Sequence, residues 1–526
     1  MIAIISIDFG RMETFNRLNP DQFMQRRAFL QVAAGTSALA GLGGFGFLSQ
    51  LPRVSAAEAK VDPKTVRFHA DVEPLVRFLE DTPRERLLEE VGARINRGLA
   101  YRELLTALLL AGVRNIQPRP VGFKFHAVLV VNSAHLASLA SPDTDRWLPI
   151  FWALDQFKSS QAADVREGDW TLAPVDEAAV PPGHRAKQAL IDALDNWDEA
   201  AADVAIVGLA RTAGANEIYE VLCRYGVRDF RELGHKEIYV ANSFRALDAI
   251  GWHHAEPVLR SLTYAMLDRV GAKENPSKAD FPADRPFRRN VEALKEIRPG
   301  WLNGQTDPDA TAEMLQAIRS GSAVDTSQLV VKLLNRGVAP QSLFDALFDG
   351  AGELLMQSPG IQSLHATTFT NAVHYSWRHA QNDETRKLLL LQNAAFLPLF
   401  RGNAKDKGIR IDKLEPVALK ETGAGAVEEI FADVGSDKTR LGAAGKILTH
   451  LKANPDPKPL ADAARRLIFL KGRDSHDYKF SSAVLEDYQH LSSPWRERFL
   501  AASVFNLRGS GETDNPLAQR IRAALA

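Results

Sequence analysis

Four histidines occupy one equivalent place in the sequence, each following a loop and preceding or opening a helix-like segment. Imidazole is a frequent neutral ligand of transition metals, and four helix starts can converge on one point. Four such ligands without a cysteine favour iron, manganese, copper, nickel or zinc over calcium. The alternative is a structural role, in which each ring caps its helix or satisfies a loop carbonyl. The four residues are His126, His235, His365 and His476.

Lys479 follows His476 by three residues, and residues i and i+3 of a helix share a face. Its amine can therefore reach the same predicted centre. A protonated amine would repel a metal cation, whereas a neutral amine can add carbon dioxide and become N6-carboxylysine, which offers anionic oxygens. The alternative is an exposed lysine paired with Asp474 or Asp477.

Five further polar residues recur behind the four histidines. Two are histidines nine residues further on, and three are asparagines six or seven residues further on. This spacing makes them candidates for hydrogen bonds to the ligands or for lining a pocket, although bridges between buried helices explain them equally well. They are His135, His374, Asn132, Asn242 and Asn371.

Helical segments must position these residues, because apolar side chains recur at helical spacing almost throughout. Segments such as "PRERLLEEVGARI" and "SLFDALFDGAGELL" have the i, i+3, i+4, i+7 pattern. Three amphipathic runs, beginning near 97, 212 and 336 and closed by glycine, are each followed by a loop and a histidine-led run, and a looser fourth unit leads to His476. The sequence therefore predicts an all-α protein of degenerate helix pairs packed around a central metal or active-site cavity.

The N-terminal segment reads as an export signal. Arg26 and Arg27 precede a short stretch rich in Gly, Ala and Ser, and an A-x-A site ends at Ala59. We expect residues 1–59 to be a removable twin-arginine signal recognised by the twin-arginine translocase. That route implies a periplasmic or exported protein without a stable membrane span. Residues 60–526 are then one all-helical domain with loops near 175–185, 271–286 and 453–459.

Composition excludes some functions. The chain has 64 Lys+Arg and 65 Asp+Glu, so it has no global basic field and nucleic acid is not an expected partner. Cys223 is the single cysteine, which excludes an intrachain disulfide and a cysteine-based zinc site.

Short motifs around the histidines resemble the questin oxidase-like family. "SHDYKFSSAVLEDYQHL" resembles its H-x-x-K-F segment, "FHAVLVVNSAHLAS" its F-H-G-L-I-R-x-A-H segment, and "LHATTFTNAVHYSW" its I-H-A-V-T segment. "GHKEIYVANSFRALDAIG" stands for the remaining histidine segment, with different flanks. These motifs cover about a fifth of the chain.

The resemblance implies an all-α non-heme iron oxygenase acting on anthraquinone-type polyketides. It carries over a ferrous ion held by His126, His235, His365 and His476, with Lys479 as the carboxylated lysine. We therefore expect an exported iron-dependent oxidoreductase that uses dioxygen and an aromatic or polyketide-like small molecule. The alternatives are a non-catalytic helical scaffold and a metal-dependent hydrolase, although the chain lacks H-E-x-x-H and G-x-S-x-G.

Overall fold

The computed structural model describes residues 64–436 and 438–526, and within them the secondary structure is helical apart from one isolated bridge between Gln305 and Val338. The predicted all-α class is confirmed. The export signal expected at 1–59 lies outside the described residues. None of the helices in the described ranges is long and apolar enough to cross a membrane.

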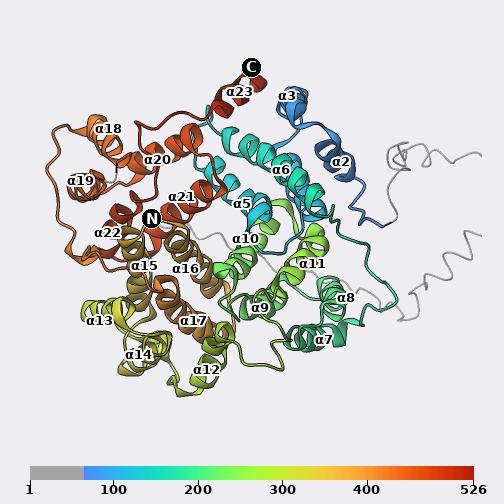
Figure 1. The fold of residues 1–526 in the computed structure, drawn as a ribbon, viewed down its shortest axis with the longest axis horizontal. Helices are drawn as coiled ribbons and strands as arrows, with labels where there is room; N and C mark the ends of the chain where they lie inside the picture. The colour runs from blue at the N-terminus through green and yellow to red at the C-terminus, as the bar shows by residue number, and fades with distance from the viewer. Residues whose placement is uncertain (1–63, 437) are drawn as a thin grey trace, which may run out of the picture. The chain divides into compact units, whose positions relative to one another are not determined.

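Four helices pack side by side in a closed arrangement, here called the four-helix ring. They are α5 (His126–Leu139), α10 (His235–Ile250), α16 (Ile361–His379) and α21 (Ser475–Asp487). α5 packs against α10 and α21, and α16 packs against the same two helices. Figure 1 shows these helices in the middle of the described part of the chain, surrounded by the others.

The ring helices all run in the same direction. Asn132 and Asn242, the seventh and eighth residues of α5 and α10, are hydrogen-bonded to each other. Ser482, the eighth residue of α21, donates to the carbonyl of Ser133, the eighth of α5. Because neighbouring helices are parallel, the chain must travel back along the ring before it enters the next one. This return, together with the further outer helices in each connection, separates the histidine-led segments by more than a hundred residues.

The returning segments contribute most of the outer helices. Between the start of the described residues and α10 these are α2 (Glu73–Asp81), α3 (Arg84–Ile95), α4 (Tyr101–Asn115), α6 (Leu148–Glu167), α7 (Gly183–Asn196), α8 (Glu199–Ala210) and α9 (Ala215–Gly226). Between α10 and α21 they are α11 (Ala255–Met266), α12 (Arg285–Ala293), α13 (Pro308–Ser320), α14 (Ala323–Arg336), α15 (Pro340–Gln357), α17 (Asp383–Arg401), α18 (Gly423–Val434), α19 (Arg440–Ala453) and α20 (Lys458–Lys471). After the ring come α22 (Trp495–Ser503) and α23 (Pro516–Leu525).

Short 3₁₀ turns join several of these helices. They are η5 (Phe123–Phe125), η6 (Glu232–Gly234), η7 (Trp252–His254), η8 (Pro282–Asp284), η9 (Leu294–Glu296), η10 (Trp301–Asn303), η11 (Ile411–Lys413) and η12 (Tyr488–His490). The segments expected as loops near 175–185, 271–286 and 453–459 contain the connections between α6 and α7, between α11 and α12, and between α19 and α20, although their ends extend into the neighbouring helices.

Each ring helix packs against the helix that immediately precedes it: α4 on α5, α9 on α10, α15 on α16 and α20 on α21. The predicted helix pairs are therefore present. Two glycines expected to close the first helix of a pair lie inside it instead, because α4 continues past Gly112 and α15 past Gly350. A Cβ at Gly112 would lie 2.8 Å from Val128 of α5, so this glycine allows close packing of the pair.

Candidate metal centre

The rings of the four predicted histidines meet at the N-terminal end of the four-helix ring. Their ligand nitrogens all lie within 4.8 Å of one another. His126 and His235 are the first residues of α5 and α10, His476 is the second residue of α21, and His365 is the fifth of α16. His235 and His365 are buried, whereas His126 and His476 are partly exposed.

The four imidazoles form a quadrilateral in the same order as the helices. Along its sides the ring centroids are separated by 5.0 Å (His126–His235), 4.4 Å (His235–His365), 5.1 Å (His365–His476) and 4.4 Å (His476–His126). The diagonal from His126 to His365 is longer, at 6.5 Å. The Nε2 atom of His235 lies 2.9 Å from both the Nε2 of His126 and the Nε2 of His365.

Every Nδ1 atom of the cluster has an oxygen partner. Nδ1 of His126 donates to the Phe123 carbonyl at 3.0 Å, and Nδ1 of His365 donates to the Ile361 carbonyl at 2.6 Å. Nδ1 of His235 donates to the carbonyl of Glu232. A carbonyl oxygen can only accept, so these rings carry their proton on Nδ1 and present a lone pair at Nε2.

Asp474 orients the fourth imidazole. Its carboxylate accepts from Nδ1 of His476 at 2.5 Å and from the backbone N–H of the same residue at 2.8 Å, and thereby caps α21. The hydrogen bond from His476 is the main reason why the pKa of Asp474 is lowered to about 2.

The chain matches no protein-family model, no curated protein and no solved structure. Its function is therefore inferred from its own residues.

This donor set fits a metal cation. Facing lone pairs at 2.9 Å repel one another unless a positive charge lies between them, and Nε2 of His476 is buried with no hydrogen-bond partner. Protonation is disfavoured, because burial, followed by the charges of Lys479 and neighbouring rings, lowers the pKa of His126 and His235 well below its usual value. Burial does the same for His365.

The spacing also indicates the coordination. Two nitrogens bound at about 2.1 Å lie about 3.0 Å apart at right angles and about 3.4 Å apart in a tetrahedron. The observed separation of 2.9 Å agrees with right angles. His126, His235, His365 and His476 would hold a metal through their Nε2 atoms, and the short separations involving His235 would suit neighbouring ligands of one ion.

Strained loops position two of the histidines. Phe123 and Glu232, each three residues before a ligand, have left-handed φ values of 46° and 49°, and Leu233 has 52°. Such a backbone costs about 1–2 kcal/mol per non-glycine residue. In both loops the strained residue turns its carbonyl toward the ring that follows, so the strain produces the tautomer that a metal needs.

Buried ion pairs hold the second of these loops. Asp229 is fully buried and accepts from the amine of Lys236 at 2.8 Å, while Arg231 forms a two-pronged pair with Asp284 at 2.6 and 2.9 Å. Gly234 closes the loop with φ 76°, where a Cβ would lie 2.5 Å from the ring of Phe369. The ion pairs and the close packing at Gly234 together fix the position at which α10 starts.

Lys479 lies one turn below the histidines, on the interior side of α21. It is buried, and its Nζ has no hydrogen-bond partner in the described structure. Burial lowers the pKa of this amine to about 7, although the charge of Asp474 opposes the shift. The exposed, ion-paired lysine considered as the alternative is not present, because Asp477 instead pairs with Arg508 at 2.8 Å.

The asparagines join neighbouring helices of the ring further down. Nδ2 of Asn132 donates to Oδ1 of Asn242 at 3.3 Å, and Nδ2 of Asn371 donates to Asp487 of α21 at 2.7 Å. Asn242 and Asn371 also line a cavity of about 20 Å³ between the four helices, together with Lys479. This volume is enough for about one water molecule.

The two histidines nine residues on have other neighbours. Nδ1 of His135 is hydrogen-bonded to the hydroxyl of Tyr101 at 3.0 Å. His374 packs edge-on against Phe344, with the ring of His490 5.1 Å away. Their contacts are to outer elements rather than to the four imidazoles.

Sequence reasoning missed the ion pair that completes the ring. Arg245, ten residues after His235, pairs through two hydrogen bonds of 2.9 Å with Glu486, ten residues after His476, and also donates to Asn371. The equal offsets from the two histidines are a signal that the sequence contains.

Proposed function

We propose that this chain is a non-heme iron oxygenase, in which His126, His235, His365 and His476 hold ferrous iron. The supporting observation is the quadrilateral of four imidazoles whose Nε2 lone pairs face one another while each Nδ1 has an oxygen partner. When bound there, iron would supply the electrons that activate dioxygen beside an organic substrate. The short family-like motifs give the same assignment.

Two observations support a redox metal over zinc or a hydrolytic centre. Right-angle spacing of the nitrogens suits a metal with more than four ligands, whereas structural and catalytic zinc is mostly tetrahedral. The cluster contains only histidine, without the carboxylates that commonly serve as a general base in hydrolases.

Lys479 completes the proposed centre as N6-carboxylysine. Its neutral amine attacks carbon dioxide, a nitrogen–carbon bond forms, and the nitrogen releases a proton, so that a carbamate anion results. Its buried, unpartnered Nζ is consistent with this modification. An anionic ligand would also offset positive charge at the centre. Four helix N-termini, each with a partial positive charge of about half a unit, converge there, and the histidine ligands carry no negative charge.

The rim of the site suits an apolar substrate. Phe123 and Ile361, whose carbonyls hold two of the ligand rings, are 74% and 52% exposed. Exposed apolar side chains on two residues whose carbonyls contact the ligand rings suit a flat, largely apolar molecule. We accordingly propose an aromatic or polyketide-like substrate that reaches the centre from this rim.

The test is reconstitution of the mature protein with ferrous iron in the absence of oxygen. We expect about one iron per chain, loss of that iron in His365→Ala with helical content retained, and dioxygen uptake with anthraquinone-type substrates in the wild type only. A non-catalytic scaffold predicts no iron and identical behaviour of the two proteins, and that result would refute the proposal.

The lysine has its own test. In the wild type, removing bicarbonate should lower the iron content, and adding bicarbonate again should restore the iron content. The iron content of Lys479→Arg should not change in either step. A Lys479→Arg protein with full iron content and activity would remove Lys479 from the centre.

We also propose export through the twin-arginine translocase. A reporter fused to residues 1–59 should reach the periplasm, and changing both Arg26 and Arg27 to Lys should retain it in the cytoplasm. Equal export of the two fusions would contradict this localisation.

A further inference from the structure

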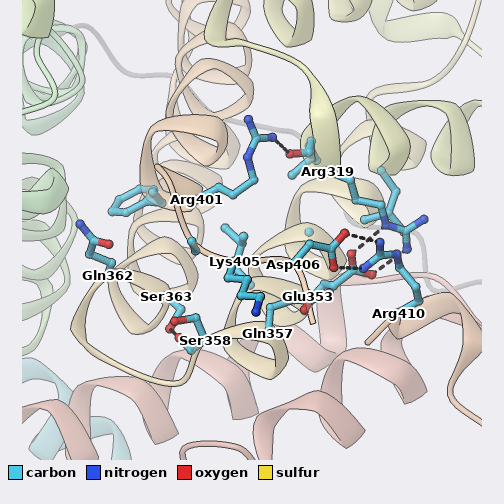
Figure 2. A pocket seen from close by; sticks show the side chains of 16 residues that line it. Arg319, Glu353, Gln357, Ser358, Gln362, Ser363, Arg401, Lys405, Asp406 and Arg410 are labelled. Atoms are coloured by element: carbon cyan, nitrogen blue, oxygen red, sulfur yellow. Dashed lines mark hydrogen bonds and ion pairs between the residues drawn. The ribbon is translucent and has the colours of Figure 1, made fainter. Parts of the chain in front are cut away.

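A second site lies beside the first turn of α16, away from the histidine side chains. It is a cavity of about 150 Å³ between α13, α15, the start of α16, the end of α17 and the loop after α17 (Figure 2). A cavity of this size accepts a ring as large as benzene. Leu315, Ile318, Leu354 and Phe400 give it an apolar wall.

Two cationic side chains of the lining are already neutralised. Arg319 pairs with Glu353 at 2.6 Å and also with Asp412, and Arg410 pairs with Asp406 at 2.6 Å. Figure 2 shows Arg319, Glu353, Asp406 and Arg410 together on one side of the cavity.

Two other cations of the lining have no carboxylate partner among the described residues. Arg401 donates only to backbone carbonyls, those of Ile318 and Gly321. Lys405 makes no ion pair or hydrogen bond with the described chain, and Figure 2 shows its side chain extending along the cavity toward Gln357. The lining therefore has two cations without a carboxylate partner, and its four cations exceed the carboxylates of Glu353, Asp406 and Asp412 by one charge.

The start of α16 adds to this positive field. Gln362 and Ser363 of its first turn line the cavity, and Gly360 at the N-cap provides no side-chain acceptor for the first N–H groups. The N-terminus of a helix of this length favours an anion.

We propose that this cavity binds a small organic anion, a carboxylate on an aromatic or aliphatic body. The apolar wall takes the body of the ligand, and Lys405 and Arg401 take the carboxylate. The site is separate from the iron centre and does not depend on it. A neutral ligand of the same shape leaves both cations without a carboxylate partner and binds less tightly.

The experiment is calorimetric titration of the full mature protein with benzoate, with benzyl alcohol as the neutral analogue and inorganic phosphate as an anion without an apolar body. We expect benzoate to bind at least about tenfold more tightly than either. Saturable benzoate binding that benzyl alcohol equals would overturn the role of charge, and binding that phosphate equals would overturn the role of the apolar wall. Absence of benzoate binding at millimolar concentration would overturn the site.

Lys405→Glu and Lys407→Glu form a matched pair, because both residues are exposed on the same loop and only Lys405 lines the cavity. Lys405→Glu should weaken benzoate about tenfold or more, and Lys407→Glu less than about twofold. Equal effects would show that only the general charge of the loop matters and would refute the assignment. Iron content should be the same in all three proteins.

Discussion

The first turn of α16 separates two regions with opposite chemistry. On the ring side, four imidazoles including His365 are mostly buried and turned together by oxygens on their outer nitrogens. In the cavity of Figure 2, the partly buried Arg401 and the exposed Lys405 have no carboxylate partner among the described residues. One region presents lone pairs and the other presents N–H donors, so the same helix end adjoins one site for a cation and another for an anion.

The difference indicates that the charge of the ligand a site favours depends more on the tautomer and burial of its side chains than on the electric field of the helix N-termini. Four helix N-termini alone would attract an anion to the ring. The imidazoles change that preference, because their Nδ1 protons are fixed on carbonyls and a carboxylate and only Nε2 lone pairs remain inside. In the cavity no such lone pairs oppose the field, and the cations strengthen it.

The largest expected effect is a loss of metal affinity that leaves benzoate binding unchanged. His235 is the histidine closest to two others, so His235→Ala should lower metal affinity by more than about a hundredfold. Benzoate affinity should stay within about twofold. Metal analysis after anaerobic reconstitution measures metal binding, and calorimetry measures benzoate affinity. His253→Ala, at an exposed histidine, is the control. Loss of both ligands together would show that the regions are not independent.

A smaller effect is expected from the residue that orients His476. Asp474→Asn keeps a good helix cap but removes the charge that holds Nδ1 of the ring. Metal affinity should fall about 10- to 100-fold, and the free energy of unfolding should fall by about 1–2 kcal/mol, because the charged hydrogen bond to His476 is lost. Competition with a chelator measures the first and urea unfolding the second. An unchanged metal affinity would mean that Asp474 acts only as a cap.

His374 tests whether every buried histidine of α16 belongs to the metal site. Burial, with smaller contributions from His490 and Arg378, lowers its pKa from about 6.5 to about 3. As pH falls below about 6.5, His374 is protonated in the unfolded chain but stays neutral in the folded chain, so the free energy of unfolding decreases. At pH 5 the decrease is about 2 kcal/mol.

Replacement by glutamine removes that titration. His374→Gln should lose less stability than the wild type between pH 7 and pH 5, as measured by urea unfolding at both values, and should retain its metal. A parallel pH dependence of the two proteins would contradict the lowered pKa of His374, and loss of metal in the variant would contradict the separation of His374 from the centre.

The smallest effect concerns the ring itself. Asn242 accepts from Asn132 and donates to the carbonyl of Leu129 at 3.1 Å, so Asn242→Ala leaves buried polar groups unpaired. The free energy of unfolding should fall by about 1–2 kcal/mol, with metal and benzoate affinities within about twofold. A large loss of metal would assign Asn242 to the centre.

Local signals allowed the sequence to predict much of the site. The recurring amphipathic runs and the histidines behind each loop were enough to predict helix pairs and the four residues that meet. Other features had no local signal. The left-handed residues Phe123, Glu232 and Leu233 are not types that favour that backbone, and ion pairs far apart in the sequence hold the second loop.

Glycine shows why local rules fail in a packed protein. Gly112 and Gly350 resemble helix stops, yet each lies inside a helix. Glycine is required at both positions because a neighbouring side chain leaves no room for a Cβ. Local rules also fail to predict the cavity of Figure 2, because its lining combines four helices and the loop that ends at Arg410.

The sequence by itself determined which segments are helices and which side chains stand at their starts, because periodicity and loop residues act over a few positions. Only the tertiary structure decided that four imidazoles more than a hundred residues apart share one centre, that each ring turns Nε2 inward, and that Lys479 is buried without a partner. Desolvation is the physical reason. It depends on every helix packed around a group, and no single segment contains that information.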